Sequence, residues 1–250
     1  MADDALAEAR YAKLTWNAPL SEQHADELLT HLDTRPDTSL VDLGCGWGEL
    51  LLRAAWRATG AATTAQPITA TFTGVDTDAS GLARGRRAAE RRALQQHVSF
   101  LEQPADAWRE PRDRAICIGS SHTLGGSKAM LERLAEVVPH GGRVLVGDMC
   151  WERTPTEAAH AMFGDEVPLL ADFVAMCRET GWEVLHLSTS DQREWDDFES
   201  RHRAGLREWL LTNPDSPKAK EVREQQDERE RDYVGTYRGV LGFVYLVLGR

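Results

Sequence analysis

The sequence has no apolar run long enough to cross a membrane, which takes roughly 18 consecutive apolar residues in a helix. Its most apolar window, residues 240–248, has only the length of a strand and contains Gly242. The first ten residues include several acids and lack the basic segment and apolar stretch of a signal peptide. We therefore expect a cytoplasmic protein that does not associate with membranes.

Cysteine is scarce, and its spacing matches no common metal-binding pattern. The four cysteines are far apart, with no Cys-x-x-Cys pair and no histidine at zinc-ligand spacing: Cys45, Cys117, Cys150 and Cys177. We expect reduced, mostly buried thiols and no bound metal.

Basic residues are too few for a protein that binds a polyphosphate backbone. Lys and Arg total 29 against 40 Asp and Glu, which gives a net charge of -11. The arginines of residues 84–92 are therefore more typical of a solvent-exposed helix face than of a nucleic-acid footprint. We expect no nucleic-acid partner, and the sequence leaves the oligomeric state open.

Short β-branched runs alternate with longer amphipathic stretches through most of the 250 residues. The runs predict seven strands at residues 40–43, 71–75, 98–101, 114–118, 143–147, 182–187 and 241–248. The stretches predict helices at residues 21–32, 49–58, 80–94, 127–138 and 166–180. This alternation indicates one α/β domain over residues 1–250: a Rossmann-like, seven-stranded, mostly parallel sheet with helices on both faces.

Three segments lie outside this alternation. Residues 191–238 predict two helices broken at residues 213–217, which we interpret as a helical lid inserted before the last strand. Residues 1–35 predict an N-terminal helical cap. The small, polar residues 59–70 predict a surface insertion without a function.

A glycine-rich turn follows the first predicted strand and opens a helix. It reads Asp42, Leu43, Gly44, Cys45, Gly46, Trp47, Gly48. Glycine permits unusual backbone angles and close approach of a ligand to the main chain, and the helix start offers unpaired N–H groups. A dinucleotide-binding turn would place its third glycine one residue later.

An acid, Asp76, ends the second predicted strand. A carboxylate at that place can accept hydrogen bonds from ribose hydroxyls, as the acid of dinucleotide-binding folds does. The alternative is a turn aspartate near the start of the next helix, where Thr77 or Asp78 would serve equally well as a cap.

This glycine pattern, with an acid before it and Asp76 after it, resembles motif I of the class I S-adenosylmethionine-dependent methyltransferases. The resemblance runs from about residue 40 to the last strand and includes the Pro139, Gly141, Gly142 turn. It is nearest to bacterial small-molecule methyltransferases. It implies S-adenosylmethionine as the cofactor, with Asp42 near its amino group and Asp76 on its ribose. The cofactor-binding residues implied or expected are Asp42, Gly44, Cys45, Gly46, Gly48, Asp76, Thr77, Ala105, Asp106 and Ser120.

The residues expected to contact the adenine ring of the cofactor depart from the family pattern. Members usually place an acid after the third strand, but Pro104 stands there in this chain. Asp106, two residues later, is the nearest substitute. Its alternative role is to cap a short helix that runs through Trp108.

His122 follows the fourth predicted strand and is expected to face the transferable methyl group, because ligands bind at the carboxyl ends of such strands. Its ordinary pKa of ~6.5 suits a catalytic base that deprotonates the acceptor. The alternatives are that it only orients substrate or bonds its own loop. An acceptor that arrives already nucleophilic needs alignment and no base.

Other candidate substrate contacts come from three segments. Trp151 and Glu152 follow the fifth strand and are expected to form a wall for a cationic or aromatic substrate, with lid packing as the alternative. Tyr11 and Trp16 lie ahead of the first helix, where a segment folds over the cofactor in the family; core packing is their alternative. The lid segment adds aromatics that suit either a small organic substrate or the lid's own core: Trp195, Phe198, Trp209, Tyr233 and Tyr237.

These observations predict an S-adenosylmethionine-dependent methyltransferase that acts on a small molecule. Two alternatives remain open: a methyltransferase of protein or RNA, and a non-catalytic S-adenosylmethionine-binding protein, because a fold does not fix a function. The sequence does not identify the acceptor atom, which can be N, O, C or S.

Overall fold

The computed structural model describes residue 6 and residues 9–60 and 68–250. Parts of two predicted segments fall outside the described residues: residues 1–5, 7 and 8 of the N-terminal cap, and residues 61–67 of the surface insertion. In the part that is described, no helix has the length and apolar character needed to cross a membrane.

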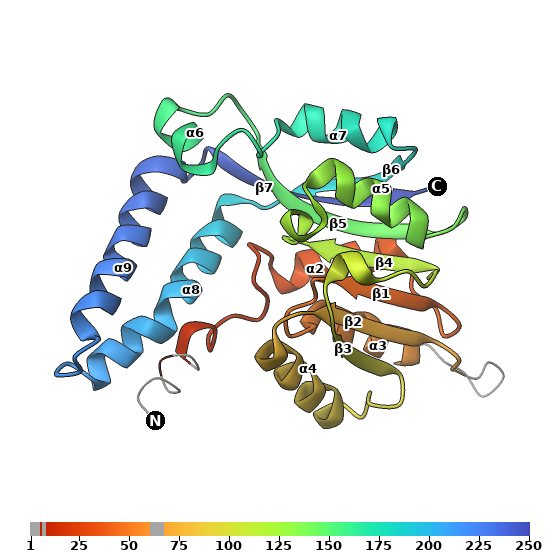
Figure 1. The fold of residues 1–250 in the computed structure, drawn as a ribbon, viewed down its shortest axis with the longest axis horizontal. Coiled ribbons are helices and arrows are strands. Elements are labelled where there is room, and N and C mark those ends of the chain that lie inside the picture. Colours follow the sequence, from red (N-terminus) through yellow and green to blue (C-terminus); the bar gives the residue numbers. More distant parts are fainter. Residues whose placement is uncertain (1–5, 7–8, 61–67) are drawn as a thin grey trace.

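One seven-stranded sheet runs through the molecule in the order β3-β2-β1-β4-β5-β7-β6 (Figure 1). All neighbouring strands pair in parallel except β7, which is antiparallel to β5 and β6. The predicted fold class is therefore confirmed. The strands are β1 (Ser39–Leu43), β2 (Thr71–Asp76), β3 (Val98–Glu102), β4 (Arg114–Ile118), β5 (Arg143–Trp151), β6 (Glu183–Thr189) and β7 (Leu241–Gly249).

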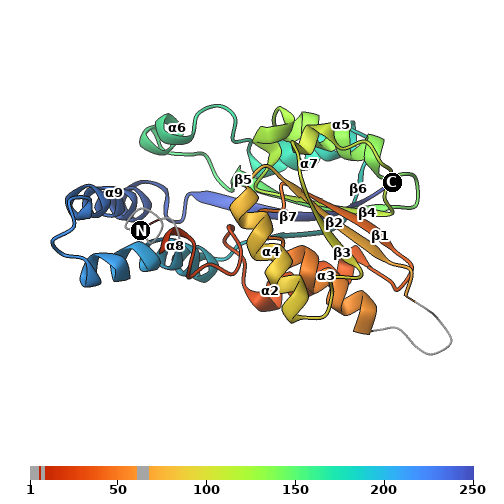
Figure 2. The same ribbon diagram turned by 60° about the horizontal axis from the view of Figure 1, so that its bottom comes forward.

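Two helical layers cover the sheet, as Figure 2 shows. On one face lie α2 (Glu22–Leu32), α3 (Glu49–Gly60) and α4 (Ala79–Arg91); on the other lie α5 (Ser127–Val137) and α7 (Leu170–Glu179). Each helix buries the apolar side that its sequence spacing predicts; in α2 the buried residues are Ala25, Leu28, Leu29 and Leu32. A short helix that the sequence analysis missed, α6 (Glu157–Phe163), follows β5.

Two helices, α8 (Gln192–Thr212) and α9 (Ala219–Asp232), connect β6 to β7 along the chain. This pair extends beyond the sheet (Figure 1). The break between them falls where residues 213–217 predicted it. The pair has its own small apolar core, against which Leu6 and Ala9 pack. A side chain at Gly205 of α8 would start 2.0 Å from the carbonyl oxygen of Ala9, so the N-terminal segment lies directly on this helix. The role of the pair as a lid stays a prediction.

Glu194 joins the start of α8 to α2. Its carboxylate accepts hydrogen bonds from the backbone N–H of Ser21 at 2.8 Å and lies 3.0 Å from Nδ1 of His24. It also accepts from the backbone N–H of Asp191, which completes a capping box at the start of α8. Burial opposes the charge of Glu194, but the hydrogen bonds from His24 and Ser21 outweigh it and lower its pKa. This carboxylate therefore fixes the base of the helical pair.

We predict that Glu194→Gln lowers the free energy of unfolding by about 1–3 kcal/mol near neutral pH, because a charged hydrogen-bond acceptor is lost. A lowered folded-state pKa means that this contribution is present above the ordinary glutamate pKa of 4.5 and disappears as the pH falls through the folded-state pKa. Urea unfolding of both proteins across this pH range checks both statements. Glu22→Gln, which removes an exposed ion pair with Arg53, is the control and should change little. A difference that persists at acid pH would contradict the assignment.

Candidate functional site

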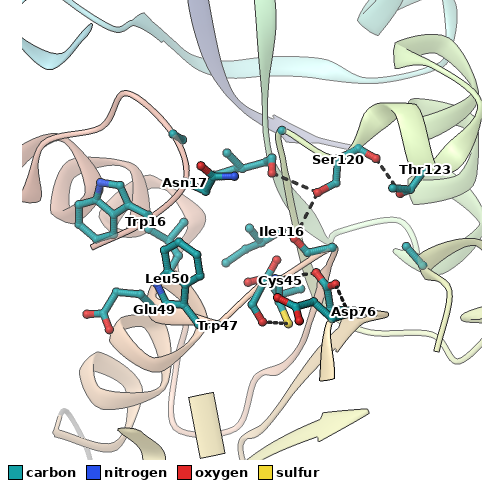
Figure 3. Close-up of a pocket in the computed structure, with 18 of the residues that line it drawn as sticks. Trp16, Asn17, Cys45, Trp47, Glu49, Leu50, Asp76, Ile116, Ser120 and Thr123 are labelled. Atoms are coloured by element: carbon teal, nitrogen blue, oxygen red, sulfur yellow. Dashed lines mark hydrogen bonds between the residues drawn. The ribbon is translucent and has the colours of Figure 1, made fainter. Parts of the chain in front are cut away.

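A cavity of about 410 Å³ opens at the carboxyl ends of the parallel strands, where the strand order reverses between β1 and β4. Figure 3 shows Trp16, Trp47 and Glu49 on one side of it and Asp76 and Ser120 on the other. We call it the cofactor cavity. Of the predicted cofactor and substrate residues, its lining contains Tyr11, Trp16, Asp42, Gly44, Cys45, Gly46, Asp76, Thr77, Ala105, Ser120 and His122.

The glycine turn forms the floor of the cofactor cavity because two glycines take left-handed backbone angles. Gly44 has a φ of +75°, and a side chain there would start 2.2 Å from Oγ of Ser120. Gly46 has a φ of +54° and nothing within 4 Å of the place where a Cβ would be. Only glycine allows this conformation and this spacing at low cost. The turn is tied to β2, since the N–H groups of Gly44 and Cys45 both donate to the carbonyl of Val75.

Two carboxylates line the cofactor cavity from adjacent strand ends. Asp76 accepts hydrogen bonds from the backbone N–H of Gly46 at 2.7 Å and of Asp78 at 2.9 Å. Asp42 is only 4% exposed, and burial, together with the nearby charge of Asp76, raises its pKa to about 8. A cationic group in the cavity would stabilise the ionised form of both acids, and carboxylate oxygens accept hydrogen bonds from hydroxyl groups. The pair therefore fits a ligand that carries an ammonium group and hydroxyl donors.

The N-terminal segment closes the other side of the cofactor cavity. Nε1 of Trp47 donates to the carbonyl of Thr15 at 2.6 Å, and Arg84 lies over the Trp47 ring while it donates to the carbonyl of Leu14. Sequence reasoning did not assign Trp47 or Glu49 to the site. Both residues lie within three positions after Gly46, and this closeness to the glycine turn could have indicated their role.

Two predicted cofactor residues lie outside the lining. A side chain at Gly48 would start 2.4 Å from the ring of Phe100, so this glycine serves the packing of the turn on β3. Asp106 is exposed and lies inside the short helix Ala105–Ala107, whose cap is Pro104. It is therefore not the N-cap that was its alternative role, and its contact with adenine stays a prediction.

A second cavity of about 810 Å³ adjoins the first, and the two share Asn17, Gly119 and His122 in their linings. We call it the acceptor chamber. It lies between the carboxyl edge of the sheet and the α8–α9 pair. Its aromatic lining consists of Phe163, Trp195, Phe198, Tyr237 and Phe243. The predicted lid aromatics Trp195, Phe198 and Tyr237 thus face this chamber, whereas Trp209 packs in the core of the helical pair.

Three residues of the chamber lining carry a buried polar atom without a hydrogen-bond partner: Oδ2 of Asp148, Nε1 of Trp195 and Nδ1 of His202. Burial raises the pKa of Asp148, which is 8% exposed, against the lowering effect of hydrogen bonds from Ser121 and Met149. The pKa of His202 falls to about 4, first because of burial and then because Arg229 is nearby. His202 is therefore neutral near pH 7.

An ion pair between a buried carboxylate and a half-buried guanidinium joins α8 to α9 at the chamber wall. Glu199 is 1% exposed and accepts two hydrogen bonds of 2.8 Å from Nε and Nη2 of Arg229. The hydroxyl of Tyr237 donates to the same carboxylate at 2.9 Å. Sequence reasoning missed Glu199, His202 and Arg229, because the charged run of α9 is typical of a solvent-exposed helix.

Trp151 and Glu152 lie outside the linings of both cavities. Trp151 is buried, donates its backbone N–H to Pro168 and meets the ring of Phe163 edge-on. Glu152 packs over Gly242, where a side chain would start 2.7 Å from its Cγ. The packing alternative fits the buried Trp151, and the expected substrate wall of Trp151 and Glu152 stays a prediction.

One further cluster of metal-type ligands occurs among the described residues, formed by Glu27, His31 and His186. It lies away from both cavities, at the end of the sheet where β5 begins, since Arg143 donates to the carbonyl of His31. The two imidazole rings stack at 4.0 Å with an interplanar angle of 16°. The lone pair of a ring nitrogen lies in the ring plane, so nearly parallel rings do not direct two lone pairs at one ion. We assign no metal to this cluster.

The family model described as a methyltransferase domain matches residues 34–203. The chain is 28% identical over 240 residues to the Escherichia coli (strain K12) protein YjhP, with 93% of each chain covered. Two solved S-adenosylmethionine-dependent methyltransferases, both in complex with S-adenosylhomocysteine, are also similar. The structure from Geobacter sulfurreducens is 26% identical with a TM-score of 0.84, over 97% of this chain and 96% of that chain. The structure from Thiobacillus denitrificans is 27% identical with a TM-score of 0.83, over 98% of both chains.

These similarities confirm the predicted family and its cofactor. The chain belongs to the methyltransferase domain family and is a class I S-adenosylmethionine-dependent methyltransferase.

Proposed function

We propose that the protein transfers a methyl group from S-adenosylmethionine to a small molecule held in the acceptor chamber. The observation that carries this proposal is the junction of the two cavities at Asn17, Gly119 and His122. A chamber of about 810 Å³ has the size of a small-molecule site. It lies between the sheet edge and the α8–α9 pair, which supports the predicted lid role of residues 191–238.

The cofactor cavity supplies groups that match the parts of the cofactor. Asp42 would pair with its cationic amino group, because this buried acid has a raised pKa and gains from a positive partner. Asp76 has acceptor capacity left beyond its two backbone hydrogen bonds and would hold the ribose hydroxyls. The open space above Gly46 lets the cofactor approach the main chain.

When bound, the cofactor supplies a sulfonium methyl group; the acceptor's nucleophile forms a bond to its carbon, and the electron pair of the broken C–S bond stays on sulfur. The chamber walls align the nucleophile and exclude water. An N–H or O–H acceptor must also release a proton. His122 lines both cavities and would take that proton, with the buried carboxyl group of Asp148 in the same chamber.

The proposed function and its two alternatives differ in what receives the methyl group: a small molecule, a macromolecule, or nothing. A net charge of -11 and a walled chamber favour a small molecule over RNA or a protein surface. The test incubates the protein with methyl-deuterated cofactor and either the small-molecule or the macromolecular fraction of a cell extract. Label in a small molecule supports the proposal. Label only in macromolecules contradicts it, and cofactor binding without transfer to either fraction indicates a non-catalytic binding protein.

Affinity for S-adenosylhomocysteine should rise with pH up to about 8 and then level off. Asp42, with a pKa raised to about 8, is largely protonated below that value, and pairing with an ammonium group requires its ionised form. The gain is up to about tenfold per pH unit. Calorimetric titrations between about pH 6 and 8.5 measure it, and Asp42→Asn should bind weakly with little pH dependence over this range. A wild-type affinity that is flat or falls with pH would overturn the role of Asp42.

Asp76→Ala should weaken S-adenosylhomocysteine binding by at least about 1 kcal/mol, or about fivefold, because hydrogen bonds to a charged acceptor are lost. Calorimetry measures the change. The exposed Asp172→Asn on α7 is the matched control and should leave the affinity unchanged. Equal affinities of Asp76→Ala and wild type would refute the ribose role.

His122→Gln should reduce kcat by about 10²-fold or more if the imidazole removes the acceptor's proton. Cofactor affinity should change much less than turnover, since His122 lies at the edge where the two cavities meet. The exposed His140→Gln serves as the control. Turnover of the labelled acceptor at the wild-type rate would remove His122 from the site.

A further inference from the structure

Helix α8 presents one continuous stripe to the acceptor chamber. Trp195, Phe198, Glu199 and His202 are spaced at i, i+3, i+4 and i+7, which places them on one helical face. At 1.5 Å per residue the stripe is about 10 Å long. It therefore covers the length of a molecule with one or two rings.

The one charged residue of this stripe, Glu199, has basic neighbours on α8 and α9. Glu199 is its single buried acid, and it already has Arg229 as a bidentate partner. Nη1 of Arg203 lies 4.0 Å from the same carboxylate and is buried without a hydrogen bond. Burial is the first cause of the lowered pKa of His202; Arg229 lowers it further, and Glu199 raises it. Two guanidinium groups, those of Arg203 and Arg229, thus lie within 4.0 Å of one carboxylate.

Hydrogen-bond donors on this wall also lack acceptors. The guanidinium of Arg229 has five N–H groups and gives Nε and one hydrogen of Nη2 to Glu199, so three remain. Nε1 of Trp195 is buried without a partner and can only donate. That indole nitrogen has almost no accessible surface, whereas the Arg229 side chain is 34% exposed. An anionic oxygen group in the chamber would therefore accept hydrogen bonds from the remaining N–H groups of Arg229.

The remaining walls are largely apolar and aromatic, apart from the buried carboxyl group of Asp148 on β5. Phe163, Phe198 and Phe243 line the chamber together with Tyr237, which gives a space suited to a flat ring. The basic residue at the chamber's edge, Lys128, is exposed, as is the acid Glu166, so neither changes the buried charge pattern. Recognition of an anion therefore falls to the Arg229 side of the chamber.

We propose that the acceptor is an aromatic carboxylate, with its carboxylate group against Arg229 and its ring between the aromatic side chains of the chamber. This inference rests on the proposed function, since it names the class of small molecule that the chamber takes. Bidentate or fork-shaped hydrogen bonding makes arginine the preferred partner of a carboxylate.

The test uses pairs of probes that differ only in the charged group: 4-hydroxybenzoate with 4-hydroxybenzamide, 2-aminobenzoate with 2-aminobenzamide, and indole-3-acetate with indole-3-acetamide. Binding is measured by calorimetry on the full chain saturated with S-adenosylhomocysteine. We expect the carboxylate of at least one pair to bind about tenfold or more tightly than its amide. Arg229→Gln should abolish this preference, and Arg229→Lys should restore part of it.

Arg207→Gln is the matched control. Arg207 also joins α8 to α9, through Asp227 and Glu230, but it does not line the chamber, so its removal should leave the preference intact. Should Arg229→Gln fail to fold because Glu199 loses its partner, the double variant Glu199→Gln, Arg229→Gln removes both charges and makes the same comparison.

Three results would overturn the inference: amides that bind as tightly as carboxylates, no measurable binding by any carboxylate, or a preference that survives in the folded Arg229 variant. The proposed function fails by a different readout, namely no transfer of labelled methyl to any small molecule. If the protein methylates small molecules but binds amides and carboxylates alike, the proposed function is supported and the inference of an aromatic carboxylate acceptor is wrong.

Discussion

Two carboxyl groups on adjacent strand ends are the constraint around which the cofactor cavity is built. Asp42 and Asp76 end neighbouring parallel strands, and the Gly44–Gly46 turn between them brings both acids to one cavity. The backbone N–H of Gly46 partly compensates Asp76, but Asp42 remains buried with a raised pKa. The cavity is therefore complementary to a cation before any ligand arrives, which is the electrostatic requirement for holding a positively charged amino acid moiety.

The acceptor chamber is assembled differently, from elements that lie far apart in the sequence. The sheet supplies Asp148, the turn after β4 supplies His122, and the helical pair supplies Glu199 and Arg229. Each of these elements is anchored independently: β5 by its nine-residue pairing with β7, and α8 by the capping box at Glu194. The cofactor cavity thus lies on the sheet, whereas part of the wall of the acceptor chamber comes from the segment between β6 and β7.

The sheet was predictable because its strands are short apolar runs with polar boundaries. Five of the seven predicted strands, for instance residues 114–118, agree with the structure to within one residue at each end. The sequence predicted that β5 ends at Gly147, but pairing with β7 extends the strand to Trp151. Local sequence propensity gives no information about this pairing, because β7 lies far away in the sequence. Helix α6 was missed because it has seven residues, although Thr156 caps it as an N-cap threonine should.

Local patterns also limited what could be said of the site. The glycine turn and Asp76 were found because their spacing is fixed within one βαβ unit. The chamber's charged residues belong to α8 and α9, where alternating charges fit a solvated helix equally well. Only the fold shows that Glu199 is buried and that Arg229 pairs with it. Trp151 and Glu152 were placed by proximity to a strand end, which does not reveal which way a side chain packs.

The N-terminal segment is a shared partition between the two cavities. Tyr11 contacts Trp47 on the cofactor side, at 6.0 Å between ring centroids, and His202 on the acceptor side, at 5.9 Å. Ala9 rests on Gly205 of α8, so a shift of that helix displaces the segment as well. A ligand in either cavity that displaced this segment would alter the other cavity, and by thermodynamic linkage the two ligands would then change each other's affinity by the same factor.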